Sequence, residues 1–86
     1  MNCNYIIGIR MDNRVSNAQR LQEVLTKNGC KIKTRLGMHE VGDDECANYG
    51  MIMLQPCGEP AEVERLVQDL NAMDGVTAKM MDLNQR

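Results

Sequence analysis

The sequence contains no Trp and no Phe, and only two Tyr among its 86 residues. A hydrophobic core must therefore be built from aliphatic side chains, with the eight Met as adaptable filler. Domains that bind single-stranded RNA on a β-sheet stack the bases on aromatic side chains. The missing aromatics therefore count against RNA binding. No run approaches 18 apolar residues, which excludes a membrane-spanning helix.

An excess of charge is also missing, since ten Lys and Arg and 12 Asp and Glu give a net charge of −2. This balance argues against nonspecific binding of nucleic acid. The first residues carry no charged stretch before their short apolar run, so we expect no signal peptide and a cytoplasmic protein. There Cys3, Cys30, Cys46 and Cys57 are expected to stay reduced, and a secreted domain with two disulfides is the alternative.

Periodicity predicts four strands and two helices. Residues 4–11 and 30–39 alternate between apolar and polar, residues 49–56 are apolar on both faces, and residues 76–83 alternate again. Apolar residues recur at helical spacing over 18–25 and 63–73, and Pro60 suits a first helical turn. The order βαββαβ predicts one α+β domain over residues 1–86 with the ferredoxin-like fold, also called the α-β plait. Two helices should cover one face of a four-stranded antiparallel sheet.

The uncovered face of this sheet is the first candidate site. By alternation it should carry five basic side chains together with apolar residues of the third strand: Arg10, Lys31, Lys33, Arg35 and Lys79. Of these, Arg10, Arg35 and Lys79 are the expected anchors for a ligand. Leu36 and Met53 are expected to serve packing. A mixed face of aliphatic, Met and basic side chains predicts self-association into a dimer or tetramer, with a small anion as a possible ligand where subunits meet.

The turn after the first strand is the second candidate. Asp12 and Arg14 stand just before the first predicted helix, where a helix N-terminus could help to anchor a carboxylate. Simple helix capping by Asp12 is the alternative. The turn has no Gly, so the phosphate cradle of acylphosphatases, which share this fold, is not expected.

Metal-binding and catalytic patterns are weak. There is no C-x-x-C or H-x-x-H pair, and His39 is the single His. We therefore expect no cofactor, no resident metal and no enzyme. The alternative is a small metal-binding protein or enzyme in which His39 and Cys57 meet across a subunit contact.

Three stretches resemble a small family of regulators of iron-only hydrogenase systems. They are residues 6–14, which include IIGI and DNR, residues 34–38 (TRLGM) and residues 74–76 (DGV). Members of that family are similar in fold to ACT domains and to the C-terminal regulatory domain of the nickel-responsive repressor. The resemblance implies an oligomer assembled through the sheets and a regulatory role. The resemblance does not imply nickel sensing, because the repressor's nickel site needs several His. It does not imply the repressor's DNA binding either, because no ribbon–helix–helix precedes the first strand.

Together these observations predict a cytoplasmic, non-enzymatic, ACT-like regulatory domain that senses a small ligand and self-associates through its sheet. We expect it to bind neither nucleic acid nor membranes directly.

Overall fold

Strands and helices follow one another in the predicted order βαββαβ. The structure is a computed structural model, which describes residues 2–12, 15–41 and 46–84. Its elements are β1 (Tyr5–Met11), α1 (Val15–Lys27), η1, a short 3-10 helix (Gly29–Lys31), β2 (Ile32–Val41), β3 (Cys46–Pro56), α2 (Pro60–Asn71) and β4 (Val76–Asp82).

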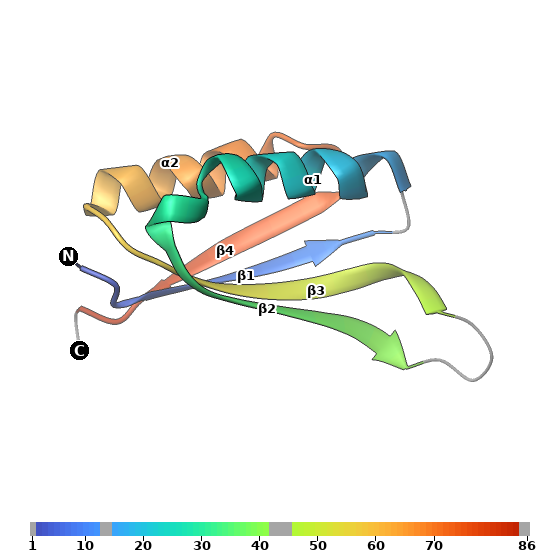
Figure 1. Ribbon diagram of the computed structural model, residues 1–86, viewed down its shortest axis with the longest axis horizontal. Helices are drawn as coiled ribbons and strands as arrows, with labels where there is room; N and C mark the ends of the chain where they lie inside the picture. The colour runs from blue at the N-terminus through green and yellow to red at the C-terminus, as the bar shows by residue number, and fades with distance from the viewer. Residues whose placement is uncertain (1, 13–14, 42–45, 85–86) are drawn as a thin grey trace.

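The four strands form one sheet in the order β2-β3-β1-β4, and all neighbours are antiparallel. Both helices lie on the same side of this sheet, as Figure 1 shows. Right-handed βαβ connections place two helices on one face in this way. The ferredoxin-like α+β fold predicted from the sequence is therefore confirmed. In the described part of the chain, no helix has the length and apolar character needed to cross a membrane.

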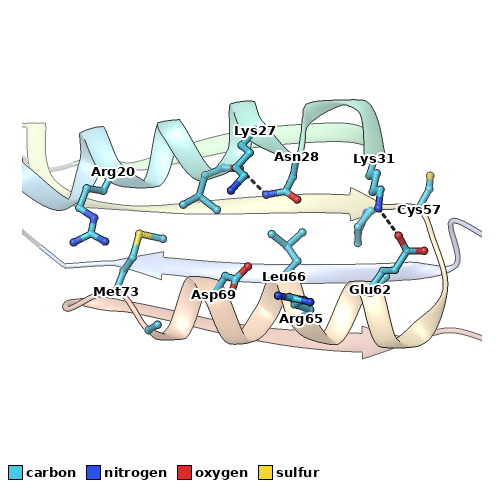
Figure 2. A pocket seen from close by; sticks show the side chains of 14 residues that line it. Arg20, Lys27, Asn28, Lys31, Cys57, Glu62, Arg65, Leu66, Asp69 and Met73 are labelled. Atoms are coloured by element: carbon cyan, nitrogen blue, oxygen red, sulfur yellow. Dashed lines mark hydrogen bonds and ion pairs between the residues drawn. The ribbon is translucent and has the colours of Figure 1, made fainter.

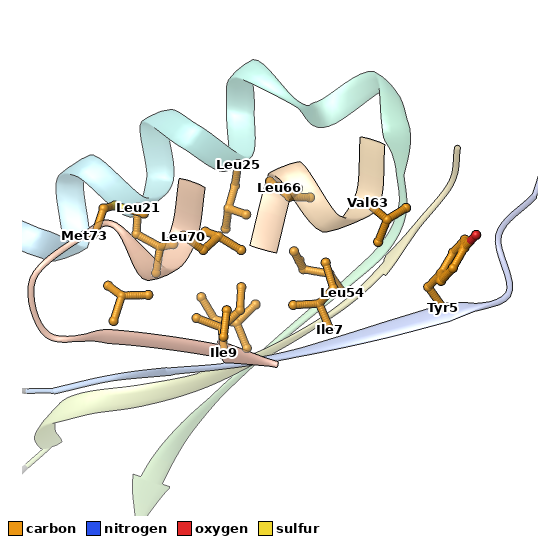
Figure 3. Close-up of a cluster of buried hydrophobic side chains, with 13 residues drawn as sticks. Tyr5, Ile7, Ile9, Leu21, Leu25, Leu54, Val63, Leu66, Leu70 and Met73 are labelled. Carbon is orange, nitrogen blue, oxygen red and sulfur yellow. The ribbon is translucent and has the colours of Figure 1, made fainter. Parts of the chain in front are cut away.

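The hydrophobic core lies between the helices and the sheet and is almost entirely aliphatic (Figure 3). The central strands contribute Ile7, Ile9 and Leu54, each at most 1% exposed. The helices cover them with their apolar stripes, Leu21 and Leu25 from α1 and Val63, Leu66 and Leu70 from α2. Tyr5 is buried at one end of the core, where its hydroxyl accepts a hydrogen bond from Asn2 Nδ2 at 3.2 Å.

Both ends of α2 follow from local chemistry. Pro60 occupies the first turn, and the backbone N–H of Glu59 donates to Glu62 Oε1 at 3.1 Å, which satisfies a donor at the start of the helix. Beyond the helix, Gly75 has a φ of 80°, a conformation that favours glycine. This turn directs the chain into β4 beside β1.

Strand β2 contains an irregularity that changes which side chains face the helices. Ile32 pairs with Pro56, but Thr34 pairs with Gln55, so two steps on β2 match one step on β3. Such a β-bulge reverses the alternation of every later residue. Ile32 packs against the core as the sequence predicts, whereas Thr34 and Leu36 point to the opposite face.

The edges of the sheet are protected from further strand pairing. At the β4 edge, Asn71 Nδ2 donates to the Ala78 carbonyl and the Ala78 N–H donates to Asn71 Oδ1, both at 2.8 Å. The Asn71 side chain thus occupies backbone groups that another strand would need. At the other edge, β2 has register shifts near both of its ends. Bulges of this kind discourage edge-to-edge association.

A disulfide joins Cys3 to Cys57, which are 54 residues apart. It links the segment before β1 to the connection between β3 and α2. Backbone bonds hold the same two segments, since Gly58 N donates to the Asn2 carbonyl at 2.7 Å. The expectation that all four Cys stay reduced is therefore wrong for this pair, which the fold brings together. Cys30 is a free, exposed thiol.

Candidate functional site

The open face is the side of the sheet that neither helix covers. Directly opposed residues in an antiparallel pair point to the same side, so the register defines its members. One row across the sheet runs from Leu36 through Met53 and Gly8 to Lys79. The described members of the open face are Ile6, Gly8, Arg10, Thr34, Leu36, Met51, Met53, Gln55, Thr77, Lys79 and Met81.

The open face exposes large apolar side chains to solvent. Leu36 is 54% exposed, Met51 47%, Met53 37% and Met81 58%. These four come from three strands, and Met53 lies between Leu36 on β2 and Gly8 on β1. A lone exposed Leu or Met is ordinary, but a contiguous apolar patch of this kind marks an interaction site.

Two of the predicted basic residues do lie on this face. Arg10 stands near the end of β1 between Met51 and Thr77, and Lys79 lies on β4 opposite Gly8. Both side chains are exposed. Their placement is confirmed, and their role in holding an anion stays a prediction.

The placement of Arg35 on the open face is wrong. Arg35 pairs with Leu54, a core residue, and so lies on the helix side of the sheet. Its guanidinium Nη2 donates to Gln22 Oε1 of α1. The bulge before Thr34 is the cause, because it turned the following β2 residues over. The same reversal exposes Leu36, which the alternation had assigned to packing under the helices. The placement of Lys31 on the open face is also wrong, because Lys31 lies in η1 and its Nζ donates to Glu62 Oε2 of α2 on the helix side.

The turn after β1 is described only in part. The backbone N–H of Asp12 donates to the Gly75 carbonyl at 2.9 Å, so this end of β1 contacts the turn that leads into β4. Arg14 lies outside the described residues. The anchoring of a carboxylate by Asp12 and Arg14 therefore stays a prediction.

The metal-binding alternative loses one of its two proposed ligands. The Cys57 sulfur is bonded to Cys3. His39 pairs with Gly50 on β3, seven residues before Cys57, which corresponds to about 23 Å along an extended strand. Within one chain these residues therefore stand at opposite ends of the sheet. Among residues 2–12, 15–41 and 46–84, no three His, Cys, Asp or Glu gather where they could hold a metal ion.

Besides the disulfide, two features of the molecule were not expected from the sequence. One is the exposure of Leu36, for which the regular pattern of residues 30–39 gave no signal. The other is a groove between α1 and α2 on the helix side (Figure 2). The charged residues beside both apolar stripes, such as Arg20 and Arg65, could be recognised in the sequence as candidates for the rim, but the space between the helices could not.

The fold and the open face define a small α+β domain of the ferredoxin-like class with an exposed apolar sheet surface. No family model matches the chain, and no curated protein matches it significantly. Among solved structures, it is similar to the uncharacterized protein TM1266 from Thermotoga maritima, with a TM-score of 0.80. The two sequences are 24% identical, and the match covers 93% of this chain and 95% of that chain. At this identity the likeness shows the fold alone.

Proposed function

We propose that the chain is a non-enzymatic regulatory domain that acts as a homodimer, in which the open faces of two copies pack against each other. The observation that carries the proposal is the exposed apolar set Leu36, Met51, Met53 and Met81 on one side of the sheet. Burying these side chains in a dimer removes apolar surface from water, which favours association by about 25 cal/mol for each Å² buried. Met side chains adapt readily to an opposing surface.

A second copy fits this face better than strand addition at an edge. Asn71 occupies the β4 edge at Ala78, and bulges interrupt the β2 edge. Four strands about 4.8 Å apart and seven residues rising about 3.3 Å each give a face of about 19 by 23 Å. Counted on both copies this is about 900 Å², below the roughly 1,200–2,000 Å² of stable interfaces and typical of weak ones, so we expect a dimer that dissociates in the micromolar range.

The regulatory role comes from the resemblance to regulators of iron-only hydrogenase systems, and that link rests on the sequence resemblance alone. In a dimer of this kind, Arg10 and Lys79 of both copies would border the interface. Clustered cations there would favour a small anion bound between subunits. The cytoplasmic location remains part of the proposal, and in a reducing compartment the Cys3–Cys57 pair would be open to reduction.

Replacing Met53 by Glu tests the dimer. The substitution places two carboxylates, one from each copy, in the centre of the interface, where desolvation and mutual repulsion oppose association. We expect the dissociation constant to rise at least a hundredfold, so that the variant sediments as a 9.7 kDa monomer across the micromolar range. Sedimentation velocity over a concentration series measures this directly.

Gln19→Glu is the matched control, because it adds the same charge at an exposed position of α1. It should leave the dissociation constant unchanged. Wild-type protein that is monomeric at every concentration, or a Met53→Glu dimer as stable as the control, would contradict the proposed function.

A further inference from the structure

The groove between α1 and α2 lies on the side of the sheet opposite the open face. It has a volume of about 690 Å³ and is lined by side chains from α1, η1, the end of β3 and α2. Small-molecule sites typically enclose about 300–1,000 Å³. The groove is therefore large enough for a metabolite-sized ligand and independent of the proposed dimer interface.

The floor of the groove is apolar. Val63 and Leu66 from α2 and Met73 from the turn after it are at most 7% exposed, and Val24 of α1 is partly buried beside them. These residues belong to the upper layer of the hydrophobic core. A ligand in the groove would thus rest its apolar part against side chains that are already fixed by core packing.

The rim is basic. Arg20 and Lys27 extend from α1 toward the space between the helices, and Arg65 borders it from α2 (Figure 2). Four basic and two acidic side chains line the groove, an excess of two positive charges in a chain whose net charge is −2. Within the described residues, Arg20, Lys27 and Arg65 make no hydrogen bond or ion pair. Their donors remain available to a ligand.

One end of the groove is closed by an ion pair. Lys31 Nζ of η1 donates to Glu62 Oε2 of α2, and this hydrogen bond lowers the pKa of Glu62, with help from the Glu59 backbone N–H. Glu62 therefore stays ionised and neutralises Lys31. Cys57 lies at the same end, where the disulfide holds the start of α2. The cations left to meet a ligand are Arg20, Lys27 and Arg65, against the single carboxylate of Asp69.

We propose that this groove binds a small organic anion, a phosphate ester or carboxylate with an apolar body. The apolar part lies on Leu66, Val24 and Met73, and the anionic group is attracted by the basic rim that Arg20, Lys27 and Arg65 form. Guanidinium groups donate paired hydrogen bonds to carboxylate and phosphate oxygens, which suits them to this role. The site needs no second copy of the chain.

Titration with 1-naphthyl phosphate tests the site, because its fluorescence is easily followed in a chain without Trp. We expect saturable binding in the submillimolar range. The neutral 1-naphthol lacks the anionic group, and inorganic phosphate lacks the apolar body. Each should therefore bind at least tenfold more weakly. In 15N-labelled protein, 1-naphthyl phosphate should shift the amide signals of α1 and α2, including Val24 and Leu66, and not those of the open face.

The double variant Arg20→Gln/Arg65→Gln should bind 1-naphthyl phosphate at least tenfold more weakly. Both side chains are exposed, so the fold should be retained. Lys33→Gln/Arg35→Gln is the control, because it removes the same two charges at exposed positions of β2 that do not line the groove, and it should bind like wild type. Met53→Glu should also bind normally, which separates this proposal from the proposed dimer. Absence of binding, equal binding of 1-naphthol, unchanged affinity in the double variant or shifts confined to the open face would overturn the assignment.

Discussion

Replacing Leu54 by Ala should lower the free energy of unfolding by about 2–5 kcal/mol. Leu54 is 1% exposed in the central strand β3, opposite Ile7, and lies beneath the helices. Removing its side chain loses apolar transfer energy and leaves a cavity that a rigid sheet fills poorly. A chain of 86 residues has about 4–13 kcal/mol of stability in total, so the variant should approach the unfolding threshold. Urea denaturation followed by far-UV circular dichroism gives the value.

Leu36→Ala is the matched comparison, because it makes the same chemical change on the neighbouring strand. Leu36 is 54% exposed on the open face, so in the monomeric Met53→Glu background its loss should change stability by about 0.5 kcal/mol or less. Uninterrupted alternation in β2 would instead place Leu36 under the helices. A loss from Leu36→Ala as large as that from Leu54→Ala would therefore contradict the bulge and the composition of the open face.

Loss of the Cys3–Cys57 disulfide should cost about 2–4 kcal/mol of unfolding free energy. The bond closes a loop that spans most of the chain, so it restricts the unfolded state strongly. We expect Cys3→Ala/Cys57→Ala to unfold at a lower denaturant concentration than wild type. Reduction of the wild-type protein should produce a shift of similar size.

Cys30→Ala provides the control for the disulfide, because Cys30 is free and exposed. It should match wild type under oxidising conditions and lose stability on reduction as wild type does. Identical stability of oxidised and reduced wild-type protein would contradict a stabilising disulfide between Cys3 and Cys57.

The architecture could be predicted from the sequence because its periodic signals are local. The alternation of residues 4–11 and the helical stripe of residues 63–73 each report which side of one element is apolar. The topology then follows from the few connections that βαβ units allow. The core accordingly contains Ile7, Ile9, Leu66 and Leu70, as these patterns indicate.

The composition of the open face could be predicted only in part. Arg10 and Lys79 lie there because β1 and β4 are regular throughout their pairing. Arg35 does not, because one bulge in β2 reversed all that follows. The sequence of residues 30–39 alternates without interruption, so it gives no sign of the bulge. The face is therefore more apolar and less basic than the sequence predicted.

The disulfide and the groove depend on tertiary structure. Cys3 and Cys57 meet only after β1 has paired with β3, so their spacing of 54 residues carries no signal. The groove exists because α1 and α2 lie apart on the sheet, a distance set by packing rather than by either helix sequence. If the two helices lay closer together, the same side chains would pack against each other and leave no groove.

Methionine methyl NMR during dilution can show whether two copies associate through the open face. In protein labelled at the Met methyl carbons, Met51, Met53 and Met81 report on the open face, while Met73 reports on the buried core. The variant Leu36→Glu keeps all three Met and should be monomeric for the same reason as Met53→Glu, because it also places a carboxylate on the open face. Dilution of wild-type protein through the micromolar range should move the signals of the first three toward their positions in Leu36→Glu, and leave the Met73 signal in place. If these three signals do not change with concentration, in protein that sedimentation shows to dissociate over the same range, then the two copies do not associate through the open face.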